Sequence, residues 1–524
     1  MGPLLRPGYI LTFDMAWTPH LAAPAVGNAN GAAVQWLLHV LALAVPSMII
    51  QKIMLLGLLM LAGWGAHRLA ALRFNTAVAY VAGTFAIFNP FVYGRFMTGQ
   101  YLVLAGYALL PWVVAAVWRL LEQPSRRHTL AVAGSMIALS WLSIHAIGLA
   151  LVATAAVTIG WGAGRWRRLV EPARRRAFVA AALIWIIANG FWLGPFLAGA
   201  TEQAHYVAAF DLAQARAFQT AGAPGLPAPA AVAVLQGFWA DPLGQYVLPS
   251  STGWLFGLAE LTLIGLMTAG LVSAWRRRDR LMLGLAAAGL LAWVLAVGIA
   301  WPPAAGLSAW LIDHLPYYRG YREPHKWAAL LALAQATCLA GGLDVVRRRW
   351  PWPDTQPLEL AARLVPLATV PMLLWGAGGQ LRSVDYPASW YQLDRRLSAA
   401  QLGGPVLLLP WHQYLTLDFA GRLAANPAGQ FFSFPTVTSA NPEMPGVPDS
   451  SAVGSRSALV QDDVLANRLI DQAAGQRLAR LGIRYVVLLK QADWTDYAWL
   501  GDQPGLNLET DNPDWQLWKV TAQP

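Results

Sequence analysis

The sequence predicts an α-helical protein that crosses a membrane many times and carries an α/β domain at its C-terminal end. Of its 524 residues, 56% are hydrophobic and only 12% are charged, whereas ordinary soluble proteins carry about 25% charged residues. The mean hydropathy is +0.43. Long apolar runs recur as far as residue 379, where strand-like and helix-like patterns begin to alternate. These observations exclude an ordinary soluble protein.

The first 48 residues are expected to form an extracytoplasmic loop with one interfacial helix. Residues 1–32 contain no apolar stretch long enough for a spanning helix or a signal peptide. Residues 33–46 are apolar but fall short of the roughly 20 residues needed to cross a bilayer. They therefore predict an interfacial or re-entrant helix.

Residues 49–379 are expected to form a transmembrane domain. Ten apolar runs within this range are long enough to be interpreted as spans, with boundaries good to a few residues. The predicted spans are 49–66, 75–93, 100–121, 128–144, 146–162, 177–199, 252–275, 281–300, 327–345 and 360–378.

The basic residues indicate how these spans are oriented. The net charge is +10, but the arginines fall in short clusters between apolar runs, so the charge indicates topology and no nucleic-acid partner is expected. The clusters on one side are Arg68 with Arg73, Arg119, Arg126 with Arg127, 165–176, 276–280 and 347–349. That side is predicted to be the cytoplasm. We expect a multi-pass protein of the plasma membrane. The N-terminus is then outside, and we expect a further helix upstream of Met1 to carry it across.

Residues 380–524 are expected to form an extracytoplasmic α/β domain. Strands are predicted at 405–410, 483–489 and 515–520, and helical periodicity covers 464–481. Residues 431–455, rich in Pro, Ser, Asn and Gly, are expected to be loop.

The stretch DHLPYYRGYREPHKW, residues 313–327, is the densest group of ionisable side chains between two apolar runs. Such groups are costly to desolvate, so a cluster at a membrane boundary usually faces water or an anion. Arginine forms bidentate contacts with phosphate, and lysine supplies a point charge. The predicted phosphate-binding residues are Arg319, Arg322, His325 and Lys326, with Lys52 and Arg95 from neighbouring external segments. The alternative is an interfacial anchor of snorkelling arginines and belt tyrosines.

Four further residues are candidates for lining a substrate groove. Glu260 lies about two turns inside a predicted span, and an intramembrane carboxylate is a functional candidate by default. His145 is at an external turn between two closely spaced spans, and Tyr318 and Tyr321 belong to the ionisable cluster. For Glu260 the alternative is an ion pair inside the bundle, and for His145 a structural hydrogen bond.

Asp14, in the stretch TFDMAWTPH, is the candidate catalytic residue. A carboxylate in a membrane-adjacent loop can act as a general base that accepts the proton of an attacking hydroxyl group. The alternative is an aspartate that caps the following turn or helix.

The sequence shows no group of residues typical of a metal site. The first loop has no pair of acidic residues to hold a metal, and the single cysteine, Cys338, lies in an apolar run. We therefore predict no cofactor and a reaction independent of metal. Trp390, Trp411 and Trp494 are candidates for stacking on a bound ligand, with the alternative that they fill the core of the C-terminal domain.

Several stretches together resemble the GT-C superfamily of polytopic membrane glycosyltransferases, and most of all its YfhO-type and arabinofuranosyltransferase-like branches. They are GYILTFDMAWTPH, PSMIIQKIMLLGLLMLAGWGAHRL, FNPFVYGRFMTGQYLVLAGYALLPW, YYRGYREPHKW, DYPASWYQLDRRL, VLLLPWHQY and LGIRYVVLLKQADW. The resemblance covers nearly the whole chain and rests on the order of these stretches. The chain departs from the superfamily in lacking the first helix before the catalytic loop.

The resemblance implies an inverting transfer of a sugar from a polyprenyl-phosphate donor to an extracytoplasmic glycan or lipid acceptor in the cell envelope. Asp14 matches the first-loop base of this superfamily, and the lipid tail of the donor would lie in a groove between spans. The main alternative is a transporter or flippase for a lipid-linked glycan, which also needs a basic pocket and a membrane groove. A third reading is a non-catalytic assembly protein.

Overall fold

The computed structural model describes residues 2–23, 31–350, 356–400, 402–444, 447, 455–468, 470 and 472–523. Its internal contacts divide the chain into two units. The membrane unit comprises Pro24–Leu37 and Ile53–Gly378. The terminal unit comprises Met1–Ala23, Leu38–Lys52 and Gly379–Pro524. Each unit is described by itself.

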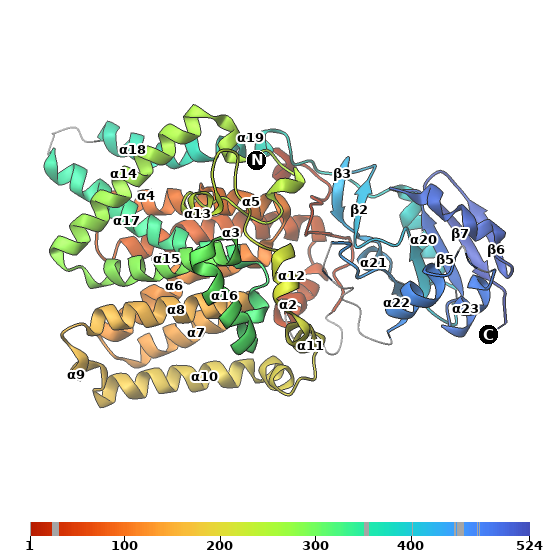
Figure 1. Cartoon of the computed structure of the whole chain (residues 1–524), viewed down its shortest axis with the longest axis horizontal. Coiled ribbons are helices and arrows are strands. Elements are labelled where there is room, and N and C mark those ends of the chain that lie inside the picture. The colour runs from red at the N-terminus through yellow and green to blue at the C-terminus, as the bar shows by residue number, and fades with distance from the viewer. Residues whose placement is uncertain are drawn as a thin grey trace. The chain divides into compact units, whose positions relative to one another are not determined.

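Eight helical segments among the described residues are long and apolar enough to cross a membrane (Figure 1). They are α3 (Ser47–Ala70), α4 with α5 (Thr76–Ile87 and Pro90–Thr98), α6 (Tyr101–Glu122), α8 (Ile144–Gly162), α10 (Pro172–Leu197), α14 (Trp254–Arg277), α15 with η3 (Arg280–Val297 and Gly298–Ala300) and η5 with α17 (Pro324–Trp327 and Ala328–Arg349). Two shorter helices, α7 (Arg126–Leu142) and α18 (Gln356–Thr369), occupy the two remaining predicted positions. The polytopic α-helical fold class is confirmed.

Helix α18 stops well short of the predicted end of its span at residue 378. Pro366 lies inside the helix, and Pro371 follows directly after Val370. A residue before proline is pushed out of the helical region, and Val370 accordingly has φ −139° and ψ 55°. The chain then forms only the short segments η6 (Pro371–Leu373) and α19 (Leu374–Gly378). The prediction of one continuous helix over 360–378 is therefore wrong.

Short helices connect the spans. The apolar helix predicted over 33–46 is present as α2 (Ala32–Ala42), and its place at a membrane interface stays a prediction. The segment 201–251, between two of the predicted spans, contains capped helices; Asp211, for example, accepts a hydrogen bond from the backbone of Gln214. The connecting elements are α1 (Gly2–Leu5), α9 (Trp166–Leu169), α11 (Glu202–Ala209), α12 (Leu212–Ala217), α13 (Ala228–Ala233), η1 (Asp241–Leu243), η2 (Pro249–Thr252), α16 (Pro302–His314) and η4 (Pro316–Tyr321).

Helix α17 is the most buried of the eight spans and packs against α14, α15 and α4. Glycines let α14 and α17 approach closely. A Cβ atom on Gly342 would lie 1.9 Å from the carbonyl oxygen of Leu266, and one on Gly270 would lie 2.0 Å from that of Cys338. Small residues at such crossings are typical of packed membrane helices.

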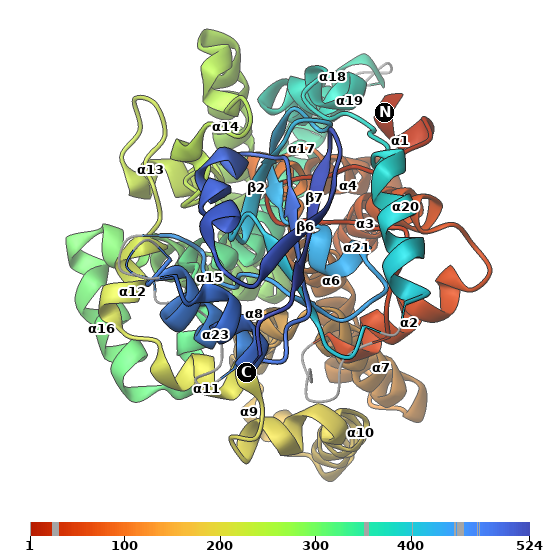
Figure 2. The ribbon, with the colours of Figure 1, turned by 90° about the vertical axis from the view of Figure 1, so that its right-hand side faces the viewer.

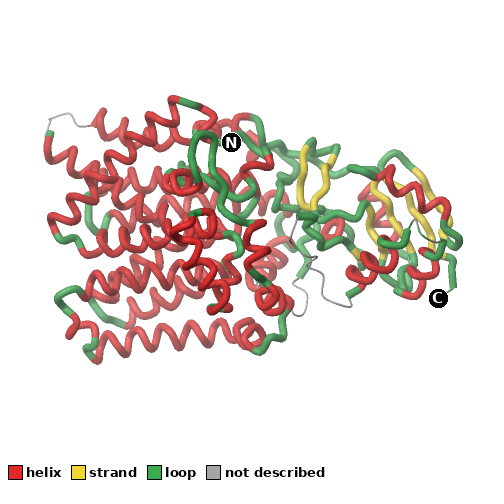
Figure 3. The backbone as a smooth tube through the Cα atoms, in the orientation of Figure 1, coloured by secondary structure: helices red, strands yellow, loops and turns green. Residues whose placement is uncertain are grey.

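The terminal unit contains a five-stranded sheet in the order β4-β1-β5-β7-β6 (Figures 2 and 3). Strands β4, β1 and β5 are parallel, and β7 is antiparallel to both β5 and β6. The strands are β1 (Val406–Leu409), β4 (Thr436–Val437), β5 (Tyr485–Leu489), β6 (Leu506–Asp511) and β7 (Trp515–Val520), with a separate β2 (Tyr414–Leu417) and β3 (Arg422–Ala425) hairpin. The three predicted strands are confirmed as β1, β5 and β7.

The helices of the terminal unit depart from the prediction in one place. The helix expected over 464–481 is two segments, the π-helical η7 (Val460–Leu465) and α23 (Ala474–Arg480). The loop expected over 431–455 contains strand β4 (Thr436–Val437), which pairs with β1, so the prediction is wrong there; 445, 446 and 448–454 lie outside the described residues. The other helices are α20 (Ala388–Ser398), α21 (Ala428–Phe431), α22 (Arg456–Leu459) and η8 (Trp494–Asp502).

Two of the three tryptophans considered for stacking on a bound ligand are core residues. Trp390 is fully buried and stacks on Phe432 at 5.5 Å between ring centroids. Trp411 belongs to the buried cluster that covers the sheet. Only Trp494 is half-buried, with the ammonium nitrogen of Lys490 at 5.1 Å from its ring. The stacking hypothesis is therefore wrong for Trp390 and Trp411.

Candidate functional site

A cluster of buried charged residues lies where α5 meets the segment before α17. We call Arg95, Glu323, His325 and Lys326 the Glu323 cluster. Local sequence explains their placement, because Asn89 caps α5 by accepting a hydrogen bond from the backbone of Val92, and Pro90 follows at the first helical position. Arg95 is thereby held on a short, fully buried helix.

Glu323 is the centre of this cluster. Its carboxylate accepts a hydrogen bond from Arg95 Nη1 at 2.9 Å and one from Gln100 Nε2 at 3.3 Å, and it lies 3.3 Å from Lys326 Nζ. Only 4% of the Glu323 surface is exposed. Burial by itself raises the pKa of Glu323, but the positive charges of Lys326, Arg95 and Arg322 outweigh it and hold the pKa below its ordinary value. Glu323 is therefore ionised.

His325 uses both ring nitrogens inside the cluster. Nδ1 lies 3.1 Å from Arg95 Nη2, and Nε2 lies 3.1 Å from the backbone oxygen of Gln236. A guanidinium only donates, so Nδ1 accepts and the ring proton is on Nε2. His325 is thus a neutral imidazole with both nitrogens engaged, and in this arrangement it has no proton to offer a phosphate. Contact between His325 and a phosphate stays a prediction, and it would require the ring to exchange one of these two partners.

The cluster carries net positive charge. Arg95 and Lys326 contribute two positive charges against the single negative charge of Glu323, which leaves one surplus positive charge among these residues; Asp241, which lines the adjoining pocket with Arg95, is not part of this count. Arg322 adds a further charge from a half-buried position, with its guanidinium 4.9 Å from the centre of the Phe218 ring. A buried ion-pair network is a common structural device, but a network with surplus positive charge suits an anion.

Other residues of the predicted stretch are structural. Arg319 donates to the backbone oxygens of Ile312 and Ala208, both at 2.8 Å, and so holds loop segments together. Tyr321 is buried, donates a hydrogen bond to the backbone oxygen of His145 and lies beside Tyr318 at 5.8 Å between ring centroids. Arg319 therefore bonds the backbone, whereas Tyr321 and Tyr317 donate to the first backbone oxygens of α8, those of His145 and Ile144.

The remaining candidates divide by location. The His145 ring lies close enough to Lys326 and Glu323 to feel their charges, which places it beside the Glu323 cluster. Glu260 is buried in α14, and within the described ranges no basic side chain forms an ion pair with it. The alternative reading of Glu260, an ion pair inside the bundle, is therefore not observed among the described residues, and its place in a substrate groove stays a prediction.

Asp14 and Lys52 belong to the terminal unit, whereas the Glu323 cluster belongs to the membrane unit. Asp14 is half-buried, and its Oδ1 accepts a hydrogen bond from the hydroxyl of Tyr414 at 3.3 Å. The Tyr414 ring stacks on Phe13 at 4.4 Å. Lys52 donates to the backbone oxygen of Arg6. Asp14 is therefore held by the β2–β3 hairpin, through Tyr414.

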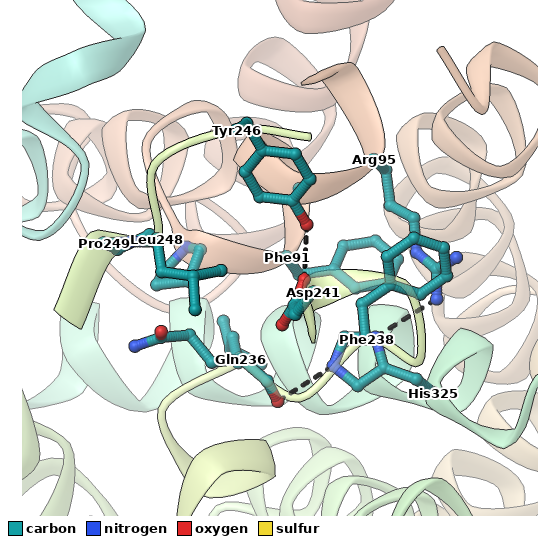
Figure 4. Close-up of a pocket in the computed structure, with 12 residues that line it drawn as sticks. Phe91, Arg95, Gln236, Phe238, Asp241, Tyr246, Leu248, Pro249 and His325 are labelled. Atoms are coloured by element: carbon teal, nitrogen blue, oxygen red, sulfur yellow. Dashed lines mark hydrogen bonds between the residues drawn. The ribbon is translucent and has the colours of Figure 1, made fainter. Parts of the chain in front are cut away.

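A small pocket adjoins the Glu323 cluster (Figure 4). Its empty volume is about 250 Å³, part of it open to solvent, and its walls include Arg95, His325, Gln236, Asp241, Tyr246 and Phe238. Burial raises the pKa of Asp241, although hydrogen bonds from Tyr246 and Gly237 act against this rise. Within the described part of the chain, no three His, Cys, Asp or Glu side chains group around a space for a metal ion.

Sequence reasoning missed Gln100, Gln236, Asp241 and Tyr246. Gln100 and the loop residues between 201 and 251 lie in no apolar or alternating pattern that would single them out. The available signal was the isolated polar residues Gln236 and Asp241 in the otherwise apolar stretch AVAVLQGFWADP. Their partners are distant in sequence and follow only from the tertiary structure.

The fold and the site define a polytopic membrane protein whose buried basic cluster lies at the end of its spans. This architecture matches solved structures of the arabinofuranosyltransferase AftD from Mycobacteria. The TM-score is 0.58 at 17% identity over 98% of this chain and 38% of that chain. For a mutant form of AftD the TM-score is 0.60 at 17% identity over 99% of this chain and 40% of that chain.

An oligosaccharyltransferase from Archaeoglobus fulgidus is a more distant neighbour, with a TM-score of 0.48 at 14% identity over 91% of this chain and 63% of that chain. No protein-family profile and no curated protein matches the sequence. The chain spans about two fifths of the length of the AftD chains that it matches. The predicted resemblance to GT-C membrane glycosyltransferases is thus confirmed as a resemblance of fold.

Proposed function

We propose that this protein is a membrane glycosyltransferase that moves a sugar from a polyprenyl-phosphate donor to a glycan or lipid acceptor of the cell envelope. The observation that carries the proposal is the surplus of buried positive charge around Glu323, at the end of a span and next to a pocket. The shared fold supports it, since AftD is named an arabinofuranosyltransferase. We place the site on the extracytoplasmic face, because the arginine-rich loops lie at the other ends of the predicted spans.

The proposed reaction is a single displacement at the anomeric carbon, with inversion. A lone pair of the acceptor hydroxyl oxygen forms the new bond to that carbon, and Asp14 takes the hydroxyl proton. The bond from the anomeric carbon to the phosphate oxygen breaks, and its electron pair stays on the phosphate. Lys326, Arg322 and Arg95 stabilise the negative charge that develops on the leaving phosphate.

The ion pairs already present in the Glu323 cluster limit how much of this charge Arg95 and Lys326 can stabilise. Arg95 and Lys326 already share the carboxylate of Glu323, so a bound phosphate would take part of their charge and hydrogen-bonding capacity. Arg322, half-buried, is the cation of this group with most access to solvent. We therefore assign to Arg322 the first contact with the donor phosphate. Arg95 and Lys326, which are buried, would stabilise the negative charge that develops on this phosphate as the bond to the sugar breaks.

The test is transfer of label by the purified protein from a panel of radiolabelled polyprenyl-phosphate sugars to a membrane glycan extract. Native protein is compared with Asp14→Asn, Arg322→Ala and the control Arg349→Ala, whose side chain is exposed at the end of α17. We expect transfer by the native protein and the control, none by Asp14→Asn, and a strong loss in Arg322→Ala. Lipid binding should survive in Asp14→Asn.

The opposite result would favour the alternative function. A protein that binds the lipid but transfers no sugar from any donor, and in which Asp14→Asn changes nothing, would be a transporter or flippase of a lipid-linked glycan. The same lipid-binding measurement separates this outcome from a protein that has lost its fold.

A further inference from the structure

The pocket beside the Glu323 cluster contains a buried amide without a hydrogen-bond partner. Gln236 is 3% exposed, and among the described residues neither its Nε2 nor its Oε1 has a partner. The backbone of this residue is fully used, since its N–H donates to Ala231 at 2.8 Å and its oxygen accepts from His325 at 3.1 Å. Buried polar groups are bonded in the large majority of cases, so this amide requires an explanation.

The chain presents Gln236 through a strained turn. Leu235 has φ +61° and Gly237 has φ +101°, so both neighbours of Gln236 are in the left-handed region. At Gly237 only glycine fits, because a Cβ atom would lie 2.7 Å from the backbone oxygen of Ala221. A non-glycine residue with positive φ persists only where its surroundings impose it, and such residues concentrate at ligand sites.

The other walls of the pocket combine hydrogen-bonding groups with aromatic faces. Asp241 accepts hydrogen bonds from the Tyr246 hydroxyl and from the backbone of Gly237 at 3.2 Å. Arg95 Nε is also buried without a partner within the described ranges, and its guanidinium lies 3.9 Å from the centre of the Phe238 ring. In Figure 4 the Gln236 amide lies on the Leu248 and Pro249 side of the pocket, away from Arg95.

These groups select a neutral hydroxyl group as the ligand. The glutamine amide can donate through Nε2 and accept through Oε1, and a sugar hydroxyl group can likewise do both. An anion would meet the carboxylate of Asp241 and the amide oxygen, and an apolar group would leave both ends of the amide unpaired. Most of the empty volume of about 250 Å³ is narrow space between side chains or open solvent, and the part that is wide enough admits a group of about the size of one water molecule, so the occupant is a single substituent and not a whole ring.

We infer that this pocket binds one hydroxyl-bearing substituent of the sugar carried by the lipid-phosphate donor, with Gln236 donating to and accepting from that hydroxyl. The inference rests on the proposed function and extends it, because it assigns a residue that discriminates between sugars. Arg95 connects the two sites, since it belongs to the Glu323 cluster and also lines the pocket. The phosphate and the sugar of one donor would then occupy adjoining places.

The test measures binding and not turnover. Full-length native protein, Gln236→Leu and the control Gln335→Leu are purified in detergent. Gln335 lies outside the pocket and donates to the backbone oxygen of Ala233. The dissociation constants of bare decaprenyl phosphate and of decaprenyl phosphate carrying a pentofuranose or a hexopyranose are measured by competition with radiolabelled lipid. Gln236→Met, which is close in shape to the native residue, repeats the comparison if the leucine variant does not fold.

We expect at least one sugar-bearing lipid to bind the native protein more tightly than the bare lipid. Gln236→Leu should lose about fivefold to tenfold in affinity for that lipid, because both hydrogen bonds of the amide to the hydroxyl are lost and each contributes little net free energy. Its affinity for bare decaprenyl phosphate should stay within about twofold of native, and Gln335→Leu should match native protein for both lipids. The melting temperature of Gln236→Leu should not fall, because the change removes an unpaired amide.

Three results would overturn the inference. The first is that the sugar-bearing lipids bind native protein no more tightly than the bare lipid. The second is that the extra affinity for a sugar-bearing lipid persists in Gln236→Leu. The third is that Gln236→Leu binds the bare and the sugar-bearing lipid more weakly by the same factor. The second result would indicate that the amide binds a buried water only. Failure of the proposed function looks different, because the donor would then bind with Gln236-dependent affinity while no sugar is transferred.

Discussion

Arg95 Nη1 and Glu323 Oε2 lie 2.9 Å apart, although 228 residues separate them in the chain. Both side chains are almost completely buried. The pair joins α5 to the segment that precedes α17, and Lys326 approaches the same carboxylate from the other side. Removing the carboxylate would leave two buried cations without this counter-charge. The contribution of Glu323 to the stability of the fold can therefore be measured by replacing it.

Glu323→Gln should lower the free energy of unfolding by about 3 kcal/mol, because breaking a buried pair leaves uncompensated buried charge. The measurement is thermal unfolding of the full-length protein in detergent. Glu509→Gln is the control, since Glu509 pairs with the exposed Arg396 at 3.2 Å and surface pairs contribute about 0–1 kcal/mol. Equal shifts in the two variants would mean that the buried pair does not stabilise the fold.

Tyr414→Phe should slow sugar transfer by about fivefold in kcat, with KM unchanged, if Asp14 is the base. The substitution removes the hydroxyl that donates to Asp14 at 3.3 Å and keeps the ring that stacks on Phe13. Tyr414 is thus a positioning residue, and Tyr414→Leu, which also loses the stacking, should cost more. A kcat unaffected by Tyr414→Phe, or a change confined to KM, would argue against orientation of Asp14 by this hydroxyl.

His412 bridges two carboxylates in the terminal unit. Its Nδ1 lies 2.6 Å from Glu443, and its Nε2 lies 3.0 Å from Asp493. The three residues follow β1, β4 and β5, so they meet at the carboxyl edge of the parallel strands. Burial lowers the pKa of His412, but the hydrogen bonds and charges of Asp493 and Glu443 raise it by more, to above the ordinary 6.5.

A histidine whose pKa is raised by folding stabilises the folded state below the unfolded pKa, and this contribution is lost as pH rises through the folded value. His412→Gln should therefore lower stability by about 1 kcal/mol near pH 6 and by much less near pH 9. Thermal unfolding at the two pH values measures this difference. His128→Gln is the control, because His128 is half-buried and its ring contacts a backbone oxygen, that of Gln123, and no carboxylate among the described residues. A pH-independent difference would contradict the bridge.

Gly270→Ala should destabilise the membrane unit by about 1–3 kcal/mol, the usual cost of overpacking a well-packed interior. The added methyl group would meet the backbone of α17 at Cys338, which has no room to give way. Gly265→Ala in the same helix has nothing within 4 Å of the added atom, and it should be neutral or stabilising because alanine favours helix. Similar melting temperatures for the two variants would show that α14 and α17 do not cross closely at Gly270.

The sequence by itself predicted the place of most spans and the class of the terminal domain, although only eight of the helical segments in the described residues are long and apolar enough to cross a membrane. Hydropathy is a local property, so ten apolar runs predicted ten helices without knowledge of their neighbours. Strand periodicity likewise located β1, β5 and β7. The exception, the end of α18, also has a local cause in Pro371. The features that the sequence predicted correctly thus depend on residues that lie within one turn or one strand of each other.

Only the tertiary structure decided which charges meet. Arg95 pairs with Glu323 across 228 residues, and Asp14 accepts from Tyr414 across 400. The same holds for Gln236, whose unpaired amide results from a strained turn and from walls supplied by distant segments. The physical reason is that the energies of burial and of ion pairing depend on distances in space. For loop residues, patterns in a single sequence do not show which distant residues will lie at those distances. The sequence thus located the charged stretch, while packing decided that Arg319 serves the backbone and that Arg95, Glu323 and Lys326 form the buried site.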